Sequence, residues 1–181
     1  MKILITGCAK SGTTLVRRLF NAFNCNVYNQ RELNVFEFAS KENVMVAKRD
    51  CDSLFSNTIS KEDTENQIFF CYKNNIKILN VIRDDSILFK HPHIEQRWIA
   101  SIKDASKYQG AISHTIHYKD LIANPDKEQQ KVAMAFGLTC VHKWSEYPDF
   151  YDITQEEDYY ELSKKDKKKY SLRKIGESYE M

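Results

Sequence analysis

Short apolar runs alternate along the chain with longer stretches in which apolar residues recur at helical spacing. The short runs predict β-strands at 2–6, 43–47, 77–82 and 111–118. The longer stretches predict helices over 12–23, about 53–73, 95–108 and 126–136. Because strands and helices alternate, we expect an α/β fold: a three-layer sandwich with a central, mostly parallel sheet and helices on both faces.

The first predicted helix has a clear apolar face. Its apolar side chains have the spacing of one helical stripe and should pack against the sheet: Val16, Leu19, Phe20 and Phe23. Arg17 and Arg18 fall outside this stripe, so we expect neither to point into the core.

Length and charge distribution predict one domain with a distinct tail. A chain of 181 residues is the size of a single domain, here expected to span 1–181. From about residue 149 the sequence is first acidic and rich in tyrosine, and then basic over 164–169. Such blocks of like charge are typical of solvated segments, so we expect a partly irregular tail.

The composition narrows the class of protein. Hydrophobic residues make up 42% of the chain, which is enough for a core. A net charge of +2 gives no reason to expect a nucleic-acid partner. The five cysteines are scattered and never spaced C-x-x-C, which favours a reducing compartment over a disulfide framework or zinc site. With no apolar run near the roughly 20 residues that span a bilayer, and no signal-peptide pattern, we expect a cytoplasmic protein without a membrane span or bound metal.

The turn between the first predicted strand and helix carries the candidate chemistry. It reads GCAKSGTT over 7–14, and Gly7 and Gly12 have the spacing of the phosphate-binding sequence GxxxxGK[ST]. Thr13 occupies the place of the lysine in that sequence, and the lysine of this turn is Lys10. A helix that begins here directs unpaired backbone N–H groups and the positive end of its dipole at an anion. The turn therefore predicts a phosphate-binding site with a displaced lysine.

Four segments resemble, in order, segments of sulfotransferases that use 3′-phosphoadenosine 5′-phosphosulfate (PAPS): KSGTT at 10–14, ILNVIRD at 78–84, RWIASI at 97–102 and HYKDLIANPDKEQQKVAMAFGL at 117–138. The resemblance covers most of the chain. It implies a P-loop-type fold and in-line transfer of a sulfuryl group from PAPS to a hydroxyl acceptor, with 3′-phosphoadenosine 5′-phosphate (PAP) as product. A sulfuryl group carries less negative charge than a phosphoryl group, so this transfer is expected to need no metal.

The same resemblance assigns residues to the cofactor. The residues that it implies for the phosphosulfate end are Lys10, Ser11, Gly12, Thr13 and Thr14. Arg83, after the strand 77–82, would bind the 3′-phosphate, because a guanidinium matches phosphate oxygens bidentately. Family members commonly have a further serine where this chain has His91, so we expect Ser86 to replace it. Arg173 and Lys174, within LRKIG, resemble a segment that closes over the 3′-phosphate.

The resemblance also implies catalytic groups. Glu32 lies where related enzymes have a glutamate that acts as general base, and Glu37 is a near rival. Lys48 resembles a catalytic lysine at a strand end, where α/β sheets bind ligands, and with Lys10 it would stabilise charge on the transferring group. Asp50 stands where the cytosolic steroid and phenol enzymes have a catalytic histidine, and is a second candidate base.

Two other functions stay open at this point. One is a small-molecule kinase, in which Asp84 or Asp85 would lie near Mg²⁺. The other is a non-catalytic module that binds PAP or another nucleotide. For the sulfotransferase, the acceptor is a glycan, phenol, lipid or tyrosine. We expect aromatic residues from two variable loops to line its pocket: Tyr28, Phe36, Phe38 and Phe55.

Overall fold

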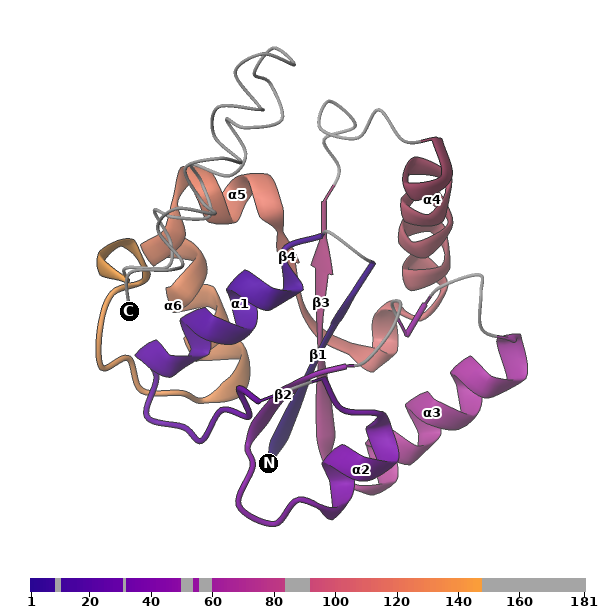
Figure 1. Cartoon of the computed structure of the whole chain (residues 1–181), viewed down its shortest axis with the longest axis horizontal. Coiled ribbons are helices and arrows are strands. Elements are labelled where there is room, and N and C mark those ends of the chain that lie inside the picture. Colours follow the sequence, from indigo (N-terminus) through magenta and orange to yellow (C-terminus); the bar gives the residue numbers. More distant parts are fainter. Residues whose placement is uncertain (9–10, 31, 50–53, 56–59, 84–91, 148–181) are drawn as a thin grey trace, which may run out of the picture.

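Four parallel strands form the sheet of the described part of the chain, in the spatial order β2-β1-β3-β4 (Figure 1). The strands are β1 (Lys2–Gly7), β2 (Val46–Lys48), β3 (Ile76–Ile82) and β4 (Ile112–His117). The computed structural model describes residues 1–8, 11–30, 32–49, 54–55, 60–83 and 92–147, with the backbone alone over 92–98. The expected α/β class with a parallel sheet is confirmed.

Helices cover both faces of this sheet (Figure 1). The longer elements are α1 (Thr13–Leu19), α2 (Val35–Ser40), α3 (Lys61–Lys73), α4 (Pro92–Lys107), α5 (Tyr118–Ala123) and α6 (Pro125–Phe136). Single 3-10 turns are η1 (Phe20–Ala22), η3 (Gln109–Ala111) and η4 (Trp144–Glu146). No helix in these described ranges has the length and apolar character needed to span a bilayer.

Side chains that alternate between the two faces of the sheet divide the core into two layers. Ile3 and Ile5 of β1 are buried with residues of α1, α5 and α6, whereas Leu4 is buried with residues of α2, α3 and α4. This follows from the two-residue period of a strand, which sends successive side chains to opposite faces. Strands covered on both sides read as continuous apolar runs, and this explains why KILI predicted a strand without alternating polarity.

The first helix packs as its apolar stripe predicted. Val16, Leu19 and Phe20 are fully buried on the sheet, and Arg18 is exposed. The α-helix ends at Leu19, earlier than the expected residue 23. The chain continues as the 3-10 turn η1, and Phe23 is already extended. The indole of Trp144 closes this layer, since its Nε1 donates to the carbonyl of Leu19 over 2.9 Å. Trp144 is therefore a core residue.

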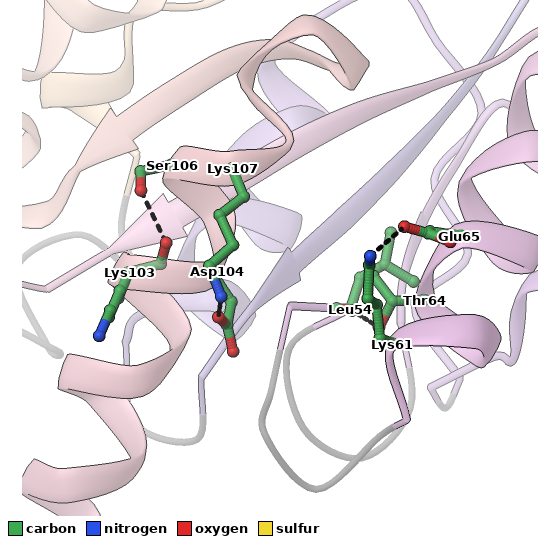
Figure 2. A network of polar contacts seen from close by, with 8 residues as sticks. All are labelled: Leu54, Lys61, Thr64, Glu65, Lys103, Asp104, Ser106 and Lys107. Atoms are coloured by element: carbon green, nitrogen blue, oxygen red, sulfur yellow. Dashed lines mark hydrogen bonds and ion pairs between the residues drawn. The ribbon is translucent and has the colours of Figure 1, made fainter.

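The predicted helix over 53–73 is shorter than expected. It begins at Lys61, where the Ser60 hydroxyl accepts a hydrogen bond from the Asp63 amide and caps the helix. Leu54 lies in a buried turn outside the helix. Its amide donates to Thr6 Oγ1 over 2.8 Å, and its carbonyl accepts from Thr64 Oγ1 over 3.4 Å. Figure 2 shows Leu54 beside Thr64 at the start of α3, together with the Lys107–Asp104 pair in the last turn of α4.

Two short helices, α2 and α5, were not predicted, and the strands β2 and β4 have bounds that differ from the predicted ones. α2 begins after Asn34, whose side chain accepts from the Glu37 amide over 2.8 Å. The strand expected over 111–118 ends at His117, because Tyr118 already begins α5. The strand expected over 43–47 is β2, which lies slightly later in the chain.

An irregular stretch lies along the outer edge of β2. We call residues 26–30 and 32–33 the edge segment. Val27 pairs with Val46 and Leu33 with Arg49, both in parallel orientation. The Tyr28 amide also donates to the Val46 carbonyl over 2.8 Å. The edge segment therefore lies beside β2 up to the carboxyl end of the sheet.

Candidate functional site

The sequence-predicted residues that the structure describes gather at the carboxyl edge of the sheet. β1 ends at Gly7, β2 at Lys48, and Arg83 follows the last residue of β3. The parallel direction of the strands brings these ends to one edge, as expected for Lys48. The candidate site is thus formed by the ends of three neighbouring strands and by the turn that leads into α1.

Lys48 connects two of the predicted site residues. Its ammonium donates to Thr14 Oγ1 over 3.1 Å and forms an ion pair with the Glu32 carboxylate. The Lys48 side chain is 16% exposed and that of Glu32 is 39% exposed. The lysine is therefore largely enclosed, while one side of the carboxylate faces solvent. The hydroxyl of Thr14 accepts from Lys48 and keeps its own proton to donate to a ligand.

The edge segment explains why Glu32 lies beside Lys48. The amide of Leu33 donates to the Lys48 carbonyl over 3.0 Å, so backbone pairing holds the preceding residue at the end of β2. The predicted proximity of Glu32 to Lys48 and to the turn is confirmed, and its catalytic role remains a prediction. Its rival Glu37 lies in α2, which packs on the face opposite to α1. Position therefore favours Glu32.

The glycines of the turn are explained by protein contacts. Gly12 has φ 92°, and a Cβ there would lie 2.4 Å from two ring carbons of Tyr118. A Cβ on Gly7 would lie 2.6 Å from both Ser11 Oγ and the Val81 carbonyl. Both glycines are thus required by the packing of the turn itself, and the assignment of Gly12 to the cofactor stays a prediction.

Hydroxyl side chains of the turn are further candidate donors, besides its backbone N–H groups. Ser11 is 1% exposed, and its Oγ has no hydrogen-bond partner among the described residues. Its amide donates to the Cys8 carbonyl over 3.0 Å, which fixes the bend of the turn. A buried hydroxyl without a partner is costly, so this oxygen favours a ligand that accepts its proton. Thr13, which is also buried, begins α1 next to it.

Arg83 is held by an aromatic ring that the sequence did not indicate as functional. The arginine is 8% exposed, and its guanidinium carbon lies 4.4 Å from the ring centroid of Tyr118. This is the distance of a cation–π contact. Because the same ring packs against Gly12, Tyr118 sets the spacing between the turn and Arg83. In the sequence, Tyr118 comes directly after β4, the strand that pairs with β3. This position is the one feature of the sequence from which its place beside Arg83 could have been inferred.

Several predicted site residues lie outside the described part of the chain. They are Lys10, Asp50, Ser86, Arg173 and Lys174, and for the kinase alternative Asp84 and Asp85. The assignments made for them therefore stay predictions.

The aromatic lining expected for an acceptor pocket is wrong in two places. Phe38 and Phe55 are at most 1% exposed and belong to the core layer under α2 and α3. Phe36 is exposed but packs edge-on against Phe70 of α3, with ring centroids 4.7 Å apart. Tyr28 is half-buried below the Lys41 ammonium. Phe38 and Phe55 therefore stabilise the core layer under α2 and α3 and are not available to an acceptor.

Comparison with known proteins gave no match: no family model, no curated protein and no solved structure matches the chain.

Proposed function

We propose that the chain is a sulfotransferase that moves a sulfuryl group from PAPS to a hydroxyl acceptor. The observation that carries this proposal is the position of the Lys48 ammonium between the Glu32 carboxylate and the Thr14 hydroxyl. A base and a cation are thereby placed next to a turn that offers hydroxyl donors. Transfer of an anionic group to a hydroxyl needs these functions: proton removal and charge stabilisation.

The donors present fit a nucleotide that carries anionic groups at both ends. Ser11 and Thr14 would donate to the phosphosulfate end, together with Lys48. Arg83 would hold the 3′-phosphate, in an orientation fixed by the ring of Tyr118. When bound, PAPS supplies the sulfuryl group and leaves as PAP.

Glu32 and Lys48 have complementary roles in this proposal. Glu32 accepts the proton of the acceptor hydroxyl as the new S–O bond forms. Lys48 stabilises the electron pair left on the bridging oxygen when its bond to sulfur breaks, acting as a compact point charge. The partial exposure of Glu32 lets an acceptor reach the carboxylate from solvent.

Calorimetry with PAP and AMP tests the nucleotide assignment. PAP should bind about 10²-fold more tightly than AMP, because Arg83 is enclosed and pairs with the additional phosphate. Equal affinities would contradict the proposal.

A transfer assay tests the reaction class. Labelled PAPS is incubated with a glycan, a phenol, a hydroxylated lipid or a tyrosine peptide, with and without a chelator. Label should reach one acceptor class in the presence of the chelator. Transfer of phosphate from ATP that stops on chelation would instead establish the kinase alternative.

A further inference from the structure

One ammonium group joins the candidate base to the phosphate-binding turn. The ammonium of Lys48 donates to Thr14 Oγ1 over 3.1 Å and is paired with the carboxylate of Glu32. The three residues come from different elements, because Lys48 ends β2, Thr14 lies in the first turn of α1, and Glu32 belongs to the edge segment. The proposed base and the proposed anion site therefore share a single positive charge.

The ion pair and the proposed role of Glu32 exclude one another. A general base accepts a proton, and a neutral carboxyl group no longer attracts an ammonium. The Lys48 side chain is only 16% exposed, so proton transfer to Glu32 would leave its charge largely enclosed and without a counter-charge. This transfer is therefore favoured when a second anion already holds Lys48.

Lys48 can exchange Glu32 for the transferring sulfuryl group without leaving Thr14. A lysine has a flexible four-carbon chain and N–H donors that rotate, so its ammonium can serve different acceptors from one position. In-line transfer requires the attacking hydroxyl to lie opposite the bridging oxygen. The sulfuryl group then has to lie between that oxygen and the base, which is the side on which Lys48 is paired with Glu32.

Glu32 gives up the ion pair at low cost. Its side chain is 39% exposed, so water can solvate the carboxylate when the ammonium turns away. Ion pairs that face solvent contribute little to stability, and an anion held by the turn can therefore compete for Lys48. The carboxylate itself stays near the turn, because the Leu33 amide is bonded to the Lys48 carbonyl over 3.0 Å.

We infer that Lys48 makes Glu32 a donor-dependent base: the ammonium passes from the carboxylate to the sulfuryl oxygens when PAPS binds, and Glu32 is then ready to accept the proton of the acceptor. The inference rests on the proposed function and adds no covalent step to it, because one ion pair is exchanged for another. Coupling between two equilibria is reciprocal, so the Glu32 carboxylate must in turn weaken the binding of PAPS.

Calorimetry with PAPS and PAP on Glu32→Gln tests this coupling. The substitution keeps the shape of the side chain and removes the charge that competes for Lys48. PAPS should bind the variant about 5-fold more tightly than the wild type, whereas the affinity for PAP, which has no sulfuryl group, should stay near that of the wild type. An equal gain for both nucleotides would indicate general charge repulsion. That result, or no gain for PAPS, would overturn the inference.

Two further variants assign the effect to Lys48. In a Lys48→Met background, Glu32→Gln should no longer strengthen PAPS binding, because the carboxylate has no ammonium to hold. Glu42→Gln is the matched control, since it removes the same charge from an exposed side chain that precedes β2 at its amino end. It should leave both affinities unchanged. A gain that persists without Lys48, or that the control reproduces, would contradict the assignment.

The carboxyl ¹³C resonance of Glu32 reports the same exchange in the unaltered chain. It should shift when PAPS is added and stay in place when PAP is added, because only the sulfuryl group takes the ammonium from the carboxylate. Equal shifts with the two nucleotides would contradict the inference even if a variant failed to fold.

Binding to the wild type separates the inference from the proposed function. If both nucleotides bind and Glu32→Gln leaves the affinity for PAPS unchanged, the donor-dependent base is wrong and the sulfotransferase proposal stands. If neither nucleotide binds the wild type, the sulfotransferase proposal and the inference are overturned together.

Discussion

Replacing Gly12 by alanine should destabilise the chain through two separate effects. The residue has φ 92°, where a side chain costs about 1–2 kcal/mol. The new methyl group would also lie 2.4 Å from ring carbons of Tyr118, which is 2% exposed and cannot turn into solvent. Overpacking of this kind costs about 1–3 kcal/mol. Gly12→Ala should therefore lower the free energy of unfolding by about 2–5 kcal/mol.

Two other glycines separate these effects in urea unfolding followed by circular dichroism. Gly137 has φ 62° and nothing within 4 Å of a built Cβ, so Gly137→Ala measures backbone strain alone. Gly110 has open space and no positive φ, so Gly110→Ala should change stability little. If Gly12→Ala costs no more than Gly137→Ala at equal m-value, the contact with Tyr118 does not constrain the turn.

A double-mutant cycle gives a second measure of the same contact. Tyr118→Ala removes the ring that the new methyl group would strike. The combined variant should then lose about 1–3 kcal/mol less than the sum of the single losses. Additive losses would show that the two positions do not interact in the folded chain.

Three further predictions concern the core, a buried carboxylate and the base. Phe20→Ala should cost about 3–5 kcal/mol in the same unfolding assay, because Phe20 is fully buried on the sheet, and a change below about 1 kcal/mol would refute that packing. Burial disfavours the charged form of Glu128, but hydrogen bonds and charges from His114 and Lys131 outweigh this and lower its pKa. Glu128→Gln should therefore lower the free energy of unfolding by about 1–3 kcal/mol near neutral pH. The difference in this free energy between variant and wild type should vanish as acid protonates the carboxyl in the folded chain, which happens below the usual glutamate pKa of about 4.3. A constant difference in unfolding free energy down to acid pH would contradict it. Glu32→Gln should lower turnover about 10²-fold while PAP binding stays near wild type, whereas unchanged turnover would pass the role of base to another carboxylate such as Asp50.

The central sheet was predictable from local pattern, because buried parallel strands are continuous apolar runs. The strand at 77–82 matches β3 closely for this reason. Short helices were missed, since six residues contain too few turns to show a period. Tyr118 extends an apolar run in the sequence and yet begins α5, so the end of the strand was placed one residue late.

The site was partly predictable. The resemblance to sulfotransferases placed Glu32 and Lys48 near the turn, and their contact is present. The role of Tyr118 between Gly12 and Arg83 was not predictable, because it depends on packing between residues far apart in the sequence. The same holds for Phe38 and Phe55: loop position suggested an acceptor pocket, while three-dimensional packing buries both in the core.

The edge segment also bears on self-association. An edge strand with unpaired backbone groups is a template for a strand of another molecule. On β2 the amide and carbonyl of Val46 and the carbonyl of Lys48 are already bonded to the edge segment. The residues that bring Glu32 to the site therefore also block strand addition at this edge. Loosening the edge segment would expose the backbone groups of β2 to strands of other molecules and, at the same time, move the Glu32 carboxylate away from Lys48. The resistance of the chain to aggregation is thereby coupled to the integrity of the site.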